Sequence, residues 1–88
     1  MTTLFREAAS VTPRQLELLA YLRRRQHWSV GELASALKVS SAAATKAVAR
    51  LERKGLATRT VDQMDRRCVN VSLTAAGVDV AHRLLSTI

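Results

Sequence analysis

The chain has 88 residues, which suits a single small domain over residues 1–88, and 48% of them are hydrophobic, which excludes a disordered composition. Lysine and arginine number 14 against 7 acidic residues, and the net charge of +7 predicts a polyanionic partner, whether nucleic acid, an anionic membrane surface or an acidic protein. One cysteine excludes an internal disulfide and no apolar stretch is long enough to cross a bilayer, so we expect a cytoplasmic protein.

The first predicted helix follows a short lead over residues 1–11. Thr12 is a suitable N-cap, Pro13 fits the first helical position, and Gln15 completes a capping box. Leucines then recur at helical spacing. The three arginines 23–25 are expected to close this helix, because positive charge interacts favourably with the carbonyl end of the helix dipole.

Residues 29–54 have the proportions of a helix-turn-helix. Ser29 caps a short helix with Glu32 in the capping-box position, and Ser40 caps a longer helix that Gly55 ends. In this motif the second helix lies in the major groove of DNA. The candidate DNA-binding residues on this helix are Ser40, Ser41, Ala42, Thr45, Lys46, Arg50 and Arg53.

The outer face of this second helix is small near its start and basic toward its end. Small side chains let a helix approach base edges, and Ala42 is suited to contact a thymine methyl group. The basic side chains suit guanine edges or phosphates. The same pattern is also common on a solvated amphipathic helix, so this helix alone does not decide between the two.

After Gly55 the spacing of hydrophobic residues changes from the helical period to the two-residue period of a strand. Residues 56–61 and 68–73 are predicted strands, joined by a hairpin over DQMDRR, and the wing therefore spans 56–73. Trp28 is placed to add a short third strand. A last helix occupies 74–88, capped by Thr74. This order predicts a mainly helical α+β fold, the winged helix-turn-helix.

Four stretches resemble the MarR family of winged-helix transcription regulators. These are VTPRQLELLAYL, RLERKGL (50–56), DQMDRR (62–67) and LTAAG (73–77), and the resemblance extends from about Thr12 to Gly77. A lone helix-turn-helix match is weak, whereas these motifs in the right order and spacing are specific.

The resemblance implies a role for the hairpin. In this family the wing tip presents an arginine to the minor groove, and an aspartate two residues earlier braces it. Carried over to this chain, Asp65 braces, Arg67 enters the minor groove and Arg66 meets a phosphate. A narrow minor groove concentrates negative potential and attracts arginine. The alternative is a solvated turn with surplus charge.

The predicted function is a transcriptional repressor that binds double-stranded DNA as a homodimer on a palindromic operator and is associated with the nucleoid. Two alternatives stay open, a winged-helix protein-interaction module and a nonspecific nucleoid-binding protein. Apolar residues near both ends form the expected dimer surface, unless the two termini pack on each other within one chain. These residues are Leu4, Phe5, Val78, Ala81, Leu85 and Ile88.

Binding of a small-molecule effector is left open. In the family, longer terminal helices form the dimer and contribute to a ligand pocket against the DNA-binding lobe. In this chain eleven residues precede Thr12 and the last predicted helix stops at Ile88, so much of that pocket is not expected.

Other reactive side chains show no catalytic or metal-binding pattern. Cys68 is expected to be a small outward strand residue rather than a redox sensor, although the neighbouring Arg67 favours a lowered thiol pKa. His27 and His82 have no ligand partners at metal spacing. We therefore expect no cofactor, no metal and no enzymatic activity.

Overall fold

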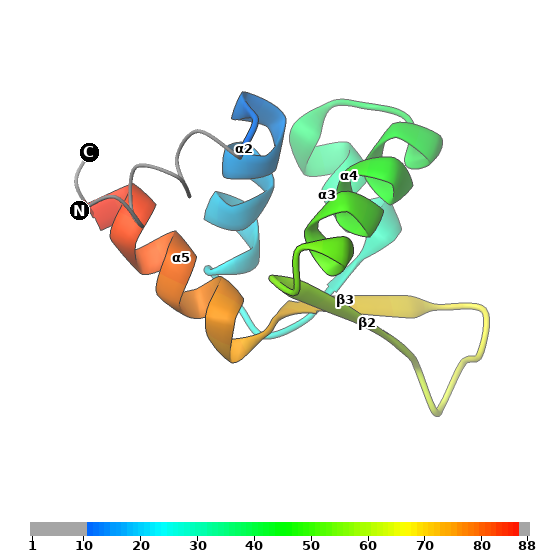
Figure 1. Cartoon of the computed structure of the whole chain (residues 1–88). Coiled ribbons are helices and arrows are strands. Elements are labelled where there is room, and N and C mark those ends of the chain that lie inside the picture. Colours follow the sequence, from blue (N-terminus) through cyan, green and yellow to red (C-terminus); the bar gives the residue numbers. More distant parts are fainter. Residues whose placement is uncertain (1–10, 87–88) are drawn as a thin grey trace.

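The computed structural model describes residues 11–86. Helices α2, α3 and α4 form one group, and the β2–β3 hairpin extends away from it (Figure 1). Helix α5 lies on the side of α2 that faces away from α3 and α4. The fold is the expected winged helix-turn-helix of the α+β class. The elements are α2 (Pro13–Leu22), β1 (Trp28–Ser29), α3 (Val30–Leu37), α4 (Ser41–Arg53), β2 (Ala57–Val61), β3 (Val69–Leu73) and α5 (Ala75–Ser86).

The helix boundaries follow local capping chemistry. The Oγ1 of Thr12 and the Oγ of Ser29 each accept a hydrogen bond from the third backbone N–H of their helix, and both capping boxes are complete. The Oγ of Ser40 accepts from the backbone N–H of Ala43 at 3.1 Å. Gly55 follows α4 with φ at 75°, a left-handed conformation that glycine adopts without strain. These caps confirm the predicted helix starts and the predicted stop at Gly55.

The first helix is shorter than predicted. It ends at Leu22 with Arg23 as its C-cap, so Arg24 and Arg25 lie beyond it. The guanidinium carbon of Arg25 lies 3.9 Å from the centre of the Trp28 ring, and its Nη2 pairs with Glu32 at 2.6 Å. A cation over an indole face is favourable, and these contacts stabilise the turn between α2 and β1.

The sheet has three antiparallel strands in the order β1-β3-β2. Trp28 pairs with Val71, which confirms the expected third strand, and Val61 pairs with Val69 at the far end of the hairpin. The strands begin at Ala57 and Val69, one residue later than predicted in each case. Cys68 belongs to the turn because its N–H donates to the carbonyl of Asp65 at 2.9 Å.

The core lies between the helices and the inner face of the sheet. Leucines of α2 and α3 meet residues of α4 and Val71 of β3. Removal of this apolar surface from water is the main stabilising contribution to such a domain. The largest fully buried side chains are Leu18, Leu19, Leu22, Leu33, Leu51, Val48 and Val71.

The last helix packs on the core through Val80, Ala81 and Leu84, of which only Ala81 belongs to the stripe expected to form a dimer surface. Val78 is 56% exposed, whereas Val80 and Leu84 are buried together with Ala81. This packing requires a glycine at position 77, because a Cβ there would overlap the backbone carbonyl of Leu56. Gly77 therefore permits the close approach of α5 to the start of the wing.

Candidate nucleic-acid interface

The outer face of α4 carries the predicted contact residues. Ala44, Ala47, Val48 and Leu51 are buried, as the helical period predicts. The candidate residues on the opposite face are therefore available to a partner. All of the α4 candidates are exposed, namely Ser40, Ser41, Ala42, Thr45, Lys46, Arg50 and Arg53.

The wing tip is an ordered turn built by Asp62. Its Oδ1 accepts hydrogen bonds from the backbone N–H of Met64 at 2.7 Å and of Asp65 at 3.4 Å. A short acidic side chain commonly closes a turn in this way. The backbone N–H of Asp62 in turn donates to the carbonyl of Cys68 at 2.9 Å, which closes the base of the loop. Asp62 thus forms the turn at the wing tip.

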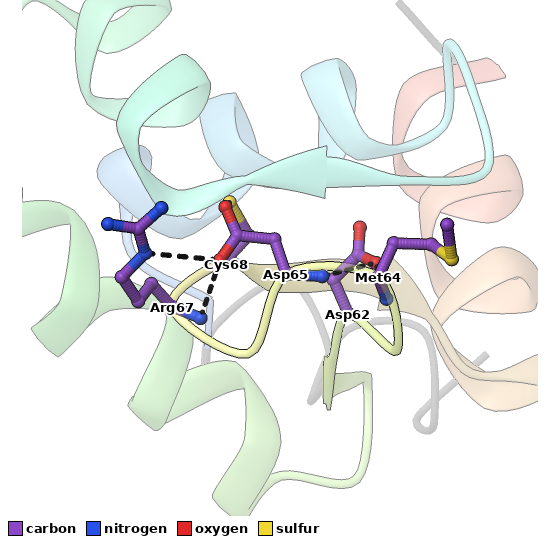
Figure 2. Close-up of polar contacts among 5 residues, drawn as sticks. All are labelled: Asp62, Met64, Asp65, Arg67 and Cys68. Carbon is purple, nitrogen blue, oxygen red and sulfur yellow. Dashed lines mark hydrogen bonds and ion pairs between the residues drawn. The ribbon is translucent and has the colours of Figure 1, made fainter.

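Asp65 fixes the position of Arg67 within this turn (Figure 2). One carboxylate oxygen, Oδ1, accepts from the backbone N–H of Arg67 at 3.1 Å and from its Nε at 3.2 Å. These two bonds, with the backbone bond first, lower the pKa of the Asp65 carboxyl. The Arg67 side chain is nevertheless 92% exposed, so its guanidinium is held at one edge and open to solvent at the other.

Cys68 is exposed and is not activated by its neighbour. Its Sγ lies 3.5 Å from Oδ2 of Asp65, and this hydrogen bond, assisted by the negative charge, raises the pKa of the thiol. The opposite effect expected from Arg67 is present but smaller. The effect of Asp65 on the thiol pKa outweighs that of Arg67, because the carboxylate that holds Arg67 also contacts the sulfur.

The wing and α4 meet in one surface groove. Thr45 of α4 lies in it together with Arg59 and Arg67 of the hairpin, in a hollow of about 420 Å³. Arg59 Nε also pairs with Glu52 of α4 at 2.7 Å, which ties β2 to the helix. Arg59 and Glu52 were not among the predicted site residues, because their pairing depends on how the hairpin packs against α4.

The candidate dimer residues that the structure describes differ in how far their side chains are exposed. Leu4, Phe5 and Ile88 lie outside the described residues. Ala81 is 1% exposed within its own chain, so it packs in the core and presents no surface to a partner. Val78 is exposed and Leu85 is partly buried against the core.

Residues 11–86 contain neither a metal-binding cluster nor a membrane-spanning helix. No cluster of three or more histidine, cysteine or acidic side chains with metal-binding geometry occurs among them. No helix in this part of the chain is long and apolar enough to span a bilayer.

A helix-turn-helix followed by an arginine-tipped wing defines the class of winged helix-turn-helix proteins. The MarR family model matches residues 11–69, more than half of the chain, and the chain therefore belongs to the MarR family. This is the family that the sequence motifs indicated, and its members are regulators rather than enzymes.

Known relatives are similar to this chain over most of its length. The HTH-type transcriptional repressor MdtR of Bacillus subtilis (strain 168) is 41% identical over 71 residues, which are 81% of this chain and 46% of that protein. The crystal structure of the YusO protein from Bacillus subtilis has a TM-score of 0.84 at 38% identity and covers 91% of this chain and 57% of its own. The chain thus spans about half the length of these relatives.

Two of the similar structures contain DNA. A mutant of S. aureus MepR bound to an oligodeoxyribonucleotide has a TM-score of 0.87 at 30% identity, and the match covers 92% of this chain and 60% of that one. The S. aureus MepR–DNA complex has a TM-score of 0.85 at 27% identity over 97% of this chain and 75% of that one.

Proposed function

We propose that this chain binds double-stranded DNA as a transcriptional regulator, and specifically as a repressor. The outer face of α4 enters the major groove and Arg67 enters the adjacent minor groove. The observation that carries this proposal is the shared groove, which Thr45 of α4 and Arg67 of the wing both line. The repressor name of the MdtR relative and the MepR structures with DNA support it.

The exposed start of α4 suits close approach to base pairs. Ser41 and Ala42 are small, so they let the helix backbone come near the base edges, and the Ala42 methyl group suits contact with a thymine methyl. Thr45, one turn further, supplies a hydroxyl that both donates and accepts. These residues give direct base contacts with few charged groups.

The wing supplies a cation whose direction is already set. An exposed ion pair such as Asp65–Arg67 contributes only about 0–1 kcal/mol to stability, so its main effect is to restrict the long arginine side chain. An arginine restricted before binding loses less conformational entropy in the minor groove. Arg66, exposed beside it, is assigned to a phosphate.

The test begins with selection of bound duplexes from a random DNA pool, followed by salt titrations of wild type and Arg67→Ala on the selected duplex. Loss of one DNA-contacting cation should lower the log–log salt slope by about one unit. It should also weaken any preference for a narrow, A·T-rich minor groove at the wing position. Arg24→Ala removes the same charge from the end of α2 and serves as the control.

Identical affinities and slopes for wild type and Arg67→Ala would remove Arg67 from the interface. Binding without sequence enrichment would favour a nonspecific nucleoid protein. No binding to any duplex at low salt, together with capture of an acidic protein partner, would favour the protein-interaction module.

A homodimer on a palindromic operator completes the proposal, because two half-sites about one helical turn apart raise affinity and specificity. Val78 supplies an exposed apolar side chain on α5, with Leu85 beside the core. A palindromic selected sequence and a dimeric mass in solution would support this assembly. A single half-site bound by a monomer would contradict it.

A further inference from the structure

A second basic groove lies on the other side of α4, where this helix adjoins α2. It has a volume of about 220 Å³, and its lining combines three cationic side chains with four apolar ones. The cations are Arg14 of α2 and Lys46 and Arg50 of α4, and the apolar residues are Leu37, Val39, Ala43 and Ala47.

The position of Arg14 is set by the end of α3. Its Nη1 donates to the backbone carbonyl of Leu37 at 3.4 Å, a contact between residues 23 positions apart in the chain. This bond satisfies a carbonyl at the C-terminus of α3 and leaves the remaining guanidinium N–H groups for another acceptor. Arg14 is exposed in the first turn of α2, which keeps it accessible from the side of α4.

Among residues 11–86, no acidic side chain lines this groove. The ion pairs found within residues 11–86 involve Arg25, Arg59, Arg67 and Arg83. The three cations repel one another across the hollow, and an anion bound between them is attracted to all three. The groove is therefore suited to an anion with several acceptor oxygens, which describes a phosphate group.

We propose that the Arg14–Lys46–Arg50 groove binds a backbone phosphate of the DNA strand that borders the major groove on the α2 side. This inference rests on the proposed function. It also assigns Lys46 and Arg50 to phosphate contacts, which leaves direct base contacts to the small residues at the start of α4.

The position of the groove fits the shape of DNA. The major groove is about 12 Å wide and has one phosphate strand along each edge, so a helix inserted in it has a strand on both sides. The groove with Thr45, Arg59 and Arg67 lies toward the wing, and the groove with Arg14 lies toward α2. α4 thus has a basic groove on each flank.

Arg14→Ala is the decisive variant, since alanine is a good helix former and Arg14 is exposed. Affinities for a selected duplex and a random-sequence duplex are measured across a salt series. Because phosphate contacts are independent of sequence, both affinities should fall by a similar factor. The log–log salt slope should fall by about 0.9. Arg24→Ala, which removes an equal charge beside a different hollow, should change the slope less.

A single methylphosphonate linkage, which removes one phosphate charge, is then placed in turn along the selected duplex. At one position on the α2 side it should weaken wild-type binding and have little further effect on Arg14→Ala. Thermal unfolding of both variants verifies that they are folded.

Equal slopes for Arg14→Ala and Arg24→Ala would overturn the phosphate site, as would the absence of any linkage coupled to Arg14. A selective loss of affinity for the selected duplex would also overturn it, because Arg14 would then contact bases. If Arg67→Ala behaves as proposed in the same assays, these results refute only the phosphate site and leave the proposed DNA-binding function standing. If wild type binds neither duplex, both proposals fail together.

Discussion

Gln15 and Lys54 join the first turn of α2 to the end of α4. The Nζ of Lys54 donates to the Oε1 of Gln15 at 2.6 Å, although the two residues are 39 positions apart. Gln15 is 3% exposed, and the same oxygen also accepts from the N–H of Thr12 at 3.4 Å. One buried amide therefore completes the cap of α2 and holds the end of the candidate recognition helix.

A double-mutant cycle measures this contact. Gln15→Met and Lys54→Met each keep a long side chain but remove the hydrogen bond, and the cycle cancels other interactions of Lys54. The expected coupling is about 0.5–1.5 kcal/mol in the free energy of unfolding, the usual net value of one hydrogen bond. Urea unfolding of the four proteins checks it, and strict additivity would show that the contact contributes nothing.

Gly77→Ala should be destabilising, because its methyl group would overlap the backbone carbonyl of Leu56 and this carbonyl cannot rotate away as a side chain does. We expect a loss of about 1–3 kcal/mol, typical of overpacking. Gly31→Ala is the matched control, since only Ser29 Oγ at 3.9 Å lies near its added methyl group. That control should be neutral or stabilise by about 0.4–1 kcal/mol. Equal thermal shifts for the two variants would contradict this packing.

Asp65→Asn should make Cys68 more reactive. Asp65 raises the pKa of the thiol through a hydrogen bond and its charge, so at mildly alkaline pH wild type holds less thiolate than a free cysteine. Removal of the charge lowers this pKa and increases the thiolate fraction. Rates of iodoacetamide alkylation against pH measure the change. In denaturant, wild type and Asp65→Asn should react at the same rate, which is the control. Equal rates for the two folded proteins would show that Asp65 has no influence on the sulfur.

Glu32 should make stability depend on pH under acidic conditions. Its pKa is lowered from 4.5 by the N–H of Ser29 first, and then by Arg25. A carboxyl with a lowered folded pKa stabilises the protein above its unfolded pKa, and this contribution is lost as the pH falls through the folded pKa. The difference in stability between wild type and Glu32→Gln should therefore narrow as the pH falls below about 4.5. A constant difference in unfolding free energy across that range would rule this out.

Local chemistry made most of the fold predictable. Thr12, Ser29 and Ser40 are caps whose partners lie three residues away, so each is visible in a short window of sequence. The change of hydrophobic period after Gly55 placed the strands to within one residue. The Asp65–Arg67 pair spans only two residues and was expected from the family resemblance.

Contacts between distant residues were not predictable in the same way. α5 is apolar on more than one side, so its period alone does not say which side enters the core, and the close approach of Gly77 to Leu56 became visible only in the packed structure. In the sequence Arg14 is an ordinary helix-start residue, and its groove forms only when α3 and α4 pack against α2.

The chain has a single tryptophan, and its position gives it an experimental use. Trp28 is largely buried, pairs with Val71 of the wing and lies under the guanidinium of Arg25. Its fluorescence therefore reports on the junction between the helices and the wing without any added label. A change in emission on addition of DNA would record movement at the base of the wing, and the same signal follows unfolding in every stability measurement above.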